Sequence, residues 1–160
     1  MNTKMFGAAM VALGIVGSVV IGATAGQEDR EDRRPQHKCS QATLSGAYGF
    51  EFGGTRPVRP PFPAGVESFS AIAIRTYDGH GSFTQISNVR SAVVGVEQDF
   101  ATGGTYDVNE DCSGSAATQT PAGVSVDRFV IMDNGDLVRN VVMSPPAVFV
   151  TGIAQKIHTK

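Results

Sequence analysis

Cys39 and Cys112 are the residues of this 160-residue chain with the most definite chemistry. Two thiols can form only one intramolecular disulfide, and oxidised cysteine pairs are typical of exported proteins. A bond between them would close a long loop and stabilise the fold by about 4 kcal/mol in the chain-entropy model. The alternative is a pair of free thiols that react or bind a metal ion. We predict the disulfide.

The three histidines are weak candidates for metal ligands. His37 lies two residues before Cys39, but a disulfide would remove that thiol from coordination. His80 stands in a predicted turn and His158 near the C-terminus, where solvated imidazoles are expected. We therefore predict no metal site and no cofactor.

The acidic residues supply two further candidates. Residues 107–111 begin with the oxygen spacing of a calcium loop, but Cys112 replaces the glycine of the sixth position and Thr118 the glutamate of the twelfth. We interpret this segment as a strand-end turn. Glu51 and Glu67 could act as acid/base groups inside a barrel, although solvated strand positions are the favoured interpretation. No nucleophile elbow or zinc-protease motif occurs, so we predict no catalytic residues.

The elements that position these residues are β-strands. Beyond residue 25, Leu occurs only at positions 44 and 137, whereas Val, Ile and Thr are frequent. β-branched side chains favour the pleated sheet, and residues 43–52 alternate with period two. Glycine, proline and Asn-Gly or Asp-Gly turns separate the segments. We expect strands at 43–52, 66–77, 82–89, 92–98, 105–108, 112–120, 124–132, 137–143 and 147–157, and a proline-rich loop at 53–65.

Eight or nine short strands in succession predict an all-β fold, a single antiparallel up-and-down barrel of about eight strands, with a β-sandwich as the alternative. A barrel leaves no exposed sheet edge. Residues 137–143 and 147–153 are apolar on both faces. We interpret the second apolar face as a subunit interface or a surface covered by a loop. The alternatives are a single well-covered sheet and an outer-membrane barrel, although the strands are short and aromatic girdles are lacking. Arg56 and Arg59 lie in the proline-rich loop, which we interpret as a stiff connection over one end of the barrel. The alternative is an extended segment that docks into a partner groove.

The N-terminus has the pattern of a secretory signal peptide. Lys4 precedes an uncharged apolar stretch that ends in Ala23-Thr24-Ala25, and small residues there suit cleavage after Ala25. We predict a signal peptide at 1–25, a flexible charged leader at 26–38 and the barrel at 39–158. The alternative is an uncleaved membrane anchor. The predicted location is secreted or periplasmic, with no stable membrane span after cleavage.

Several motifs resemble a family of small secreted bacterial proteins of uncharacterised function. The motifs are Cys39-x4-Leu44-x-Gly46-x-Tyr48, the turn Asp78-Gly79-His80-Gly81, and Gly104-x-Tyr106-x-Val108-x2-Asp111-Cys112-x-Gly114. They occur in the same order as in that family and span most of the chain beyond the leader. The resemblance implies a calycin-type or allene-oxide-cyclase-like β-barrel. It implies no chemistry, because no catalytic motif of such enzymes matches a position here.

Three functions remain open from the sequence. The first is a non-enzymatic barrel that binds a small apolar ligand, with candidate lining residues Tyr48, Phe50, Phe52, Phe69 and Phe83. The second is a structural or interaction protein that forms homo-oligomers through its apolar outer face. The third is a cyclase or isomerase, which a cavity with two or more buried ionisable groups would favour. With 13 Lys and Arg against 15 Asp and Glu, no basic surface for nucleic acid is expected.

Overall fold

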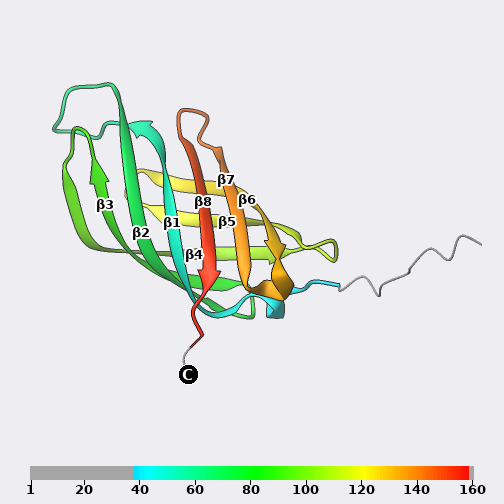
Figure 1. Ribbon diagram of the computed structural model, residues 1–160. Coiled ribbons are helices and arrows are strands. Elements are labelled where there is room, and N and C mark those ends of the chain that lie inside the picture. The colour runs from blue at the N-terminus through cyan, green and yellow to red at the C-terminus, as the bar shows by residue number, and fades with distance from the viewer. Residues whose placement is uncertain (1–37, 159–160) are drawn as a thin grey trace, which may run out of the picture. The chain divides into compact units, whose positions relative to one another are not determined.

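The computed structural model describes residues 38–158, which form a closed antiparallel barrel of eight strands in sequence order (Figure 1). The predicted up-and-down barrel is thus confirmed and the sandwich is wrong. The predicted signal peptide, His37 and nearly all of the charged leader lie outside the described residues. The strands are β1 (Ser45–Pro57), β2 (Val66–Asp78), β3 (Ser82–Ser91), β4 (Val96–Val108), β5 (Ser113–Thr120), β6 (Gly123–Met132), β7 (Leu137–Ser144) and β8 (Phe149–Lys156).

Three predicted boundaries are wrong. The first strand does not begin at residue 43, because Thr43 ends a 3₁₀ turn and β1 begins at Ser45. The proline-rich loop does not begin at residue 53, because β1 continues to Pro57 and pairs with β2 throughout and with β8 as far as Thr55. The segments 92–98 and 105–108 are not separate strands, since β4 runs unbroken from Val96 to Val108 through two glycines. Backbone hydrogen bonds from both neighbours outweigh the low strand propensity of glycine at these positions.

The order of the strands places the connections at two ends with different roles. In an antiparallel meander, the β1–β2, β3–β4, β5–β6 and β7–β8 connections lie at one end, which we call the rim. The remaining connections lie at the opposite end, which we call the base. The base also receives the 3₁₀ turns η1 (Gln41–Thr43) and η2 (Asp133–Gly135). The base is therefore closed by the two 3₁₀ turns, whereas among residues 38–158 the rim has only the loops that connect its strands.

Aromatic side chains fill the base. Tyr77 makes edge-to-face contacts with Tyr48 and Tyr106, with ring centroids 5.2 and 5.1 Å apart. The buried Tyr48 hydroxyl donates to the carbonyl of Gly135 at 2.6 Å, and burial raises the pKa of Tyr48 to about 12. The Tyr106 hydroxyl donates to the carbonyl of Leu44 at 3.0 Å. Each phenol thus keeps its proton and fastens a base segment to the barrel wall.

The disulfide predicted between Cys39 and Cys112 is present. It joins residues 73 positions apart, with the two Cα atoms 4.9 Å from each other. The backbone N–H of Cys39 also donates to the carbonyl of Glu110 at 3.2 Å. These two links attach the segment before β1 to the β4–β5 turn, so that Leu44 is fully buried beneath the barrel.

The predicted turn at 133–136 forms as η2. Asp133 and Asn134 have φ angles of 51° and 56°, and Gly135 has a φ of 100°. Asparagine and glycine tolerate this left-handed region better than other residues. The turn presents the carbonyl of Gly135 to Tyr48 and thereby completes the base.

Candidate functional site

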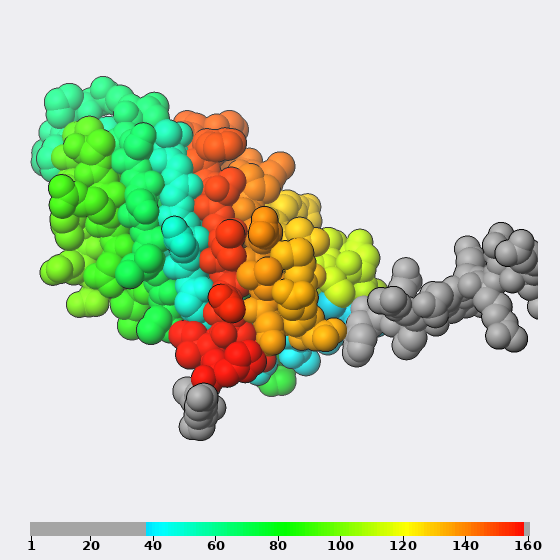
Figure 2. Space-filling view, viewed as in Figure 1, coloured from blue at the N-terminus to red at the C-terminus, as the bar shows by residue number. Residues whose placement is uncertain are grey.

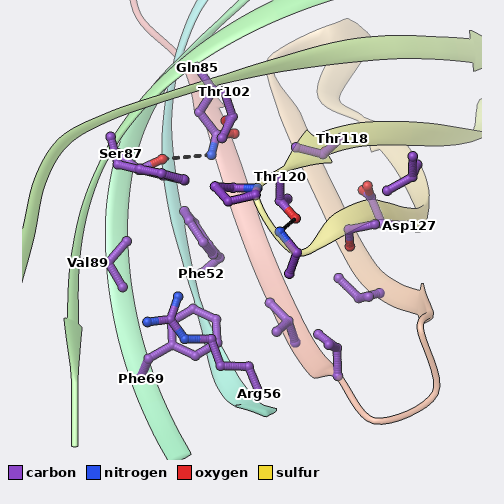
Figure 3. A pocket seen from close by; sticks show the side chains of 18 of the residues that line it. Phe52, Arg56, Phe69, Gln85, Ser87, Val89, Thr102, Thr118, Thr120 and Asp127 are labelled. Atoms are coloured by element: carbon purple, nitrogen blue, oxygen red, sulfur yellow. Dashed lines mark hydrogen bonds between the residues drawn. The ribbon is translucent and has the colours of Figure 1, made fainter. Parts of the chain in front are cut away.

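The rim half of the barrel contains a cavity of about 410 Å³ that is partly open to solvent. Rim residues such as Pro121, Pro145 and Val148 surround its mouth, and inward side chains of the strands line its wall. Figure 3 shows Phe52, Phe69 and Val89 facing the space from β1, β2 and β3. Its volume lies within the range of about 300–1,000 Å³ that is common for small-molecule sites.

The floor of the cavity contains a buried cation, Arg75 of β2, which is 5% exposed. Its guanidinium lies between the rings of Phe50 and Phe83, at 4.5 and 4.4 Å from their centroids. Its Nε donates to Oε1 of Gln85 at 2.7 Å, and Nε2 of Gln85 donates to the Ser87 hydroxyl at 2.8 Å. Two aromatic faces and a hydrogen-bonded chain therefore hold the cation in place.

A second polar group, Asp127 of β6 with Asn140 of β7, also lines the cavity. Asp127 is 3% exposed and accepts a hydrogen bond from Nδ2 of Asn140 at 2.9 Å. Burial raises the pKa of Asp127, while the positive charge of Arg75 and the bond from Asn140 oppose that shift. Oδ1 of Asn140 is buried without a hydrogen-bond partner, as is the hydroxyl of Thr102. The largely apolar cavity thus has a polar floor, on which some buried groups have no hydrogen-bond partner within the protein.

A network of ion pairs secures the rim. Glu67 is buried and pairs with Arg56, whose Nε lies 2.8 Å from Oε1. Arg56 also reaches Glu97 of β4 at 2.8 Å, and Glu97 pairs in turn with Arg59 of the β1–β2 loop. The Arg56 guanidinium stacks over Phe69, 5.0 Å from the ring centroid (Figure 3). Arg56 belongs to β1 and not to the proline-rich loop, where the sequence placed it, so this network joins β1 to β2 and β4, while Arg59 attaches the loop to β4.

Glu67 also holds the β3–β4 turn. Its Oε2 accepts hydrogen bonds from the backbone N–H groups of Val93 and Val94, both at 3.1 Å. Burial alone would raise the pKa of this carboxyl. The bonds from Val94, the Ser91 hydroxyl, Arg56 and Val93 outweigh burial and lower the pKa to about 2.

Replacing Glu67 by glutamine should therefore destabilise the protein in a pH-dependent way. Because the pKa of Glu67 is lower in the folded chain than its ordinary value of 4.5, its contribution is complete above pH 4.5. The contribution declines as the pH falls from 4.5 towards 2. Thermal unfolding should show Glu67→Gln melting below the wild type at pH 6, with the difference shrinking towards pH 2.

The matched control for this prediction is Glu51→Gln, which alters an exposed glutamate on the outer face of β1. It should unfold like the wild type across the same range, since surface substitutions seldom matter. A wild-type minus Glu67→Gln difference that stays constant from pH 6 to pH 2 would show that the carboxylate is not stabilised as described.

The five predicted ligand residues divide between the cavity and the base. Phe50, Phe52 and Phe69 line the cavity. Tyr48 and Phe83 do not, because they are buried in the core beneath it. Phe83 instead contacts the Arg75 guanidinium, whose Cζ lies 4.4 Å from the ring centroid.

The other candidates fall mainly where the sequence placed them. Glu51 is exposed, as favoured, but the interpretation of Glu67 as a solvated residue is wrong, because Arg56 and two backbone amides reach it from other parts of the chain. His80 is exposed in its turn, and His158 lies 3.4 Å from Asp136. Within 107–111, Asp111 accepts from the backbone and hydroxyl of Ser113, as a turn residue does. Residues 38–158 contain no His, Cys, Asp and Glu cluster suited to a metal ion.

Sequence reasoning missed Arg75, Gln85, Asp127 and Asn140. In β2 the alternating pattern is misleading, because Ile72 and Ile74 point outward and are 64% and 55% exposed while Arg75 points inward. One signal was present: Arg75 shares its face of the strand with the aromatic residues at 69 and 77. In β2, therefore, the alternating positions that contain aromatic residues mark the inner face of the strand, and the positions that contain isoleucine mark the outer face.

The outer surface of the barrel is partly apolar, as predicted. Ile74 of β2 pairs directly with Ile86 of β3, and Phe149 and Ile153 extend the apolar surface onto β8. Figure 2 shows β2, β1, β8 and β7 side by side on one wall, where these strands present their outer faces. In the described part of the chain there is no helix with the length and apolarity needed to span a membrane.

Comparison with protein-family models and with curated proteins finds no match to this chain. The resemblance to the family of small secreted bacterial proteins therefore stays a prediction.

Proposed function

We propose that this protein is a non-enzymatic binding protein that holds one small, mainly apolar ligand inside the rim half of its barrel. The observation that carries the proposal is the cavity of about 410 Å³, whose wall is largely apolar and whose mouth lies among the rim loops. A barrel built only for stability would fill this space with side chains, as the base does. The disulfide supports a site of action outside the cytoplasm, in the periplasm or the extracellular medium.

Blocking the cavity should abolish ligand binding without unfolding the barrel. Val150 of β8 is buried and lines the cavity, whereas its neighbour Thr151 is exposed on the outer face. We expect Val150→Trp to weaken binding of the neutral fluorophore N-phenyl-1-naphthylamine at least tenfold, because the indole occupies the probe's space. Titration of the purified protein by fluorescence measures this, and circular dichroism checks the fold.

Thr151→Trp is the matched control, since it adds the same side chain to the same strand on the opposite face. It should bind the probe like the wild type. Neither variant needs correction for native tryptophan, because the chain has none. Wild type that fails to bind the probe, or Val150→Trp that binds it equally well, would contradict the proposed function.

An enzymatic function is the second candidate, and features of the same cavity favour it. It contains two buried ionisable groups, Arg75 and Asp127, which is the arrangement that would favour a cyclase or isomerase. Asp127 could exchange a proton with a bound molecule that the Arg75 cation polarises. The two functions differ in outcome: a binding protein releases its native ligand chemically unchanged, whereas an isomerase releases a rearranged product of the same mass.

A third candidate is self-association through the apolar outer face around Ile74, Ile86 and Ile153, which are 55%, 53% and 45% exposed. Exposed apolar surface of this kind often marks an interface. Native mass spectrometry separates this candidate from ligand binding. A monomer that carries a lipid-like mass favours the binding protein, and a ligand-free dimer or trimer favours the structural role.

A further inference from the structure

The floor of the cavity has an excess of hydrogen-bond donors on its β2 side. A guanidinium carries five N–H groups, and Arg75 uses them for two hydrogen bonds, to Gln85 at 2.7 Å and to Tyr77 at 3.4 Å. Among residues 38–158, no carboxylate lies within the 4.0 Å of an ion pair to Arg75. The remaining N–H groups of this 5% exposed side chain are therefore left for a molecule in the cavity that it lines.

The β6 and β7 side of the floor has an excess of acceptors. The bond from Asn140 occupies only Oδ2 of Asp127, so Oδ1 of that carboxylate still has acceptor capacity. Oδ1 of Asn140 is buried and has no partner. Both residues line the same cavity as Arg75. A buried acceptor without a hydrogen bond costs free energy, so a ligand that donates to it gains in affinity.

The charges of the floor balance. Arg75 supplies one positive charge and Asp127 one negative charge, while Gln85, Thr102 and Asn140 are neutral. The arginines of the rim that also line the cavity, Arg56 and Arg59, are already paired with glutamates. A charged ligand group at the floor would therefore introduce a net charge into a buried site, which is unfavourable unless a partner compensates it.

Building on the proposed function, we propose that the ligand is an uncharged amphiphile whose hydroxyl group bridges the two sides of the floor. Its oxygen accepts a hydrogen bond from Arg75, and its proton is donated to Asp127 or Asn140. The apolar body extends towards the mouth between Phe52, Phe69 and Val150. A hydroxyl both accepts and donates, as this floor requires, whereas a carboxylate only accepts and an ammonium only donates.

Three probes of equal chain length test this assignment: octan-1-ol, octanoate and octylammonium. Each competes with N-phenyl-1-naphthylamine for the wild-type protein at pH 7.4, where the acid and the amine are charged. Octan-1-ol should displace the fluorophore at a concentration at least tenfold lower than either ion. Equal displacement by all three, or tighter binding of an ion, would overturn the hydroxyl assignment while leaving the proposed function intact. Failure of the fluorophore to bind would instead overturn the proposed function.

A charge-removing variant sharpens the test. Asp127→Asn leaves Arg75 without a balancing charge. Octanoate should therefore bind this variant at least tenfold more tightly than it binds the wild type, and octan-1-ol should no longer bind more tightly than octanoate. Asp99→Asn is the matched control, because it removes an equal charge at an exposed position with a φ of 49° that asparagine tolerates. If folded Asp127→Asn still prefers octan-1-ol over octanoate to the same extent, the balanced charges of Arg75 and Asp127 do not determine the choice of ligand. The wild-type series decides the proposal even if that variant does not fold.

Discussion

Replacing Cys39 and Cys112 together by serine is expected to lower the free energy of unfolding by about 4 kcal/mol. The disulfide closes a loop between residues 73 positions apart, and the entropy that this removes from the unfolded chain corresponds to that value in the chain-entropy model. For a domain of this size, the melting temperature should fall by roughly 10–20 °C. Calorimetry of the double variant beside the oxidised wild type measures both quantities.

The structure indicates where this loss acts first. The segment before β1 is attached to the base through the disulfide, the Cys39 N–H and the two bonds from Tyr106 to the carbonyls of Gln41 and Leu44. Without the covalent link, this segment should show faster amide hydrogen exchange than the strands do. The cavity lies in the other half of the barrel, so the variant should still bind the fluorophore below its melting temperature.

A reducing agent provides the control for this prediction. It should lower the melting temperature of the wild type to that of the double variant and leave the variant itself unchanged. A double variant within about 1 kcal/mol of the wild type would mean that the base segments are held by packing alone.

Replacing Gly104 by alanine should destabilise the barrel by more than about 3 kcal/mol, because overpacking against rigid backbone cannot be relieved by a change of rotamer. Gly104 lies inside β4, opposite Thr118 of β5. A Cβ atom there would overlap the carbonyl oxygen of Ala117, 2.9 Å from its carbonyl carbon and 3.0 Å from Cζ of Phe83. Chemical denaturation of the variant measures the loss.

The Gly104 substitution should also affect the cavity floor. Phe83 packs against the Arg75 guanidinium, so displacement of its ring removes one of the two aromatic contacts that hold the guanidinium in position. Any folded fraction of Gly104→Ala should therefore lose its preference for octan-1-ol over octanoate. Gly65→Ala is the control, since no heavy atom lies within 4 Å of a Cβ at that position. A Gly104→Ala protein as stable as Gly65→Ala would contradict the described approach of β4 to β5.

Local signals account for the parts of the fold that were predicted correctly. The period-two alternation predicted for 43–52, which the structure shows from Ser45 onward, the left-handed turn at Asn134-Gly135 and the Asp78-Gly79 turn each depend on neighbouring residues only. The incorrect boundaries lie where partners from distant parts of the chain decide. Gly53 and Gly54 would favour a loop in isolation, but pairing with both β2 and β8 makes them part of β1.

The candidate site was predictable only in part for the same reason. Three of the five aromatic candidates, Phe50, Phe52 and Phe69, do line the cavity. Tyr48 lies on the same face of β1 as Phe50, yet it falls below the floor and belongs to the base. Position along the strand separates these roles, and the height of each residue in the barrel depends on the register of all eight strands.

By itself, the sequence determined that the domain is built of short antiparallel strands and has one pair of cysteines able to form a single disulfide, because β-branched composition, turn residues and cysteine number are properties of the chain itself. It left both the barrel and the sandwich open, and the closed barrel was decided by the pairing of β1 with β8. Tertiary structure decided which face of each strand turns inward and which polar groups are buried there. A charged side chain can be buried at tolerable free-energy cost only when partners from other parts of the chain contact it. Arg75 has Gln85 and two phenyl rings, and Asp127 has Asn140. Glu67 has Arg56 and two backbone amides. Those partners come together only after the barrel closes, so no local pattern could show them.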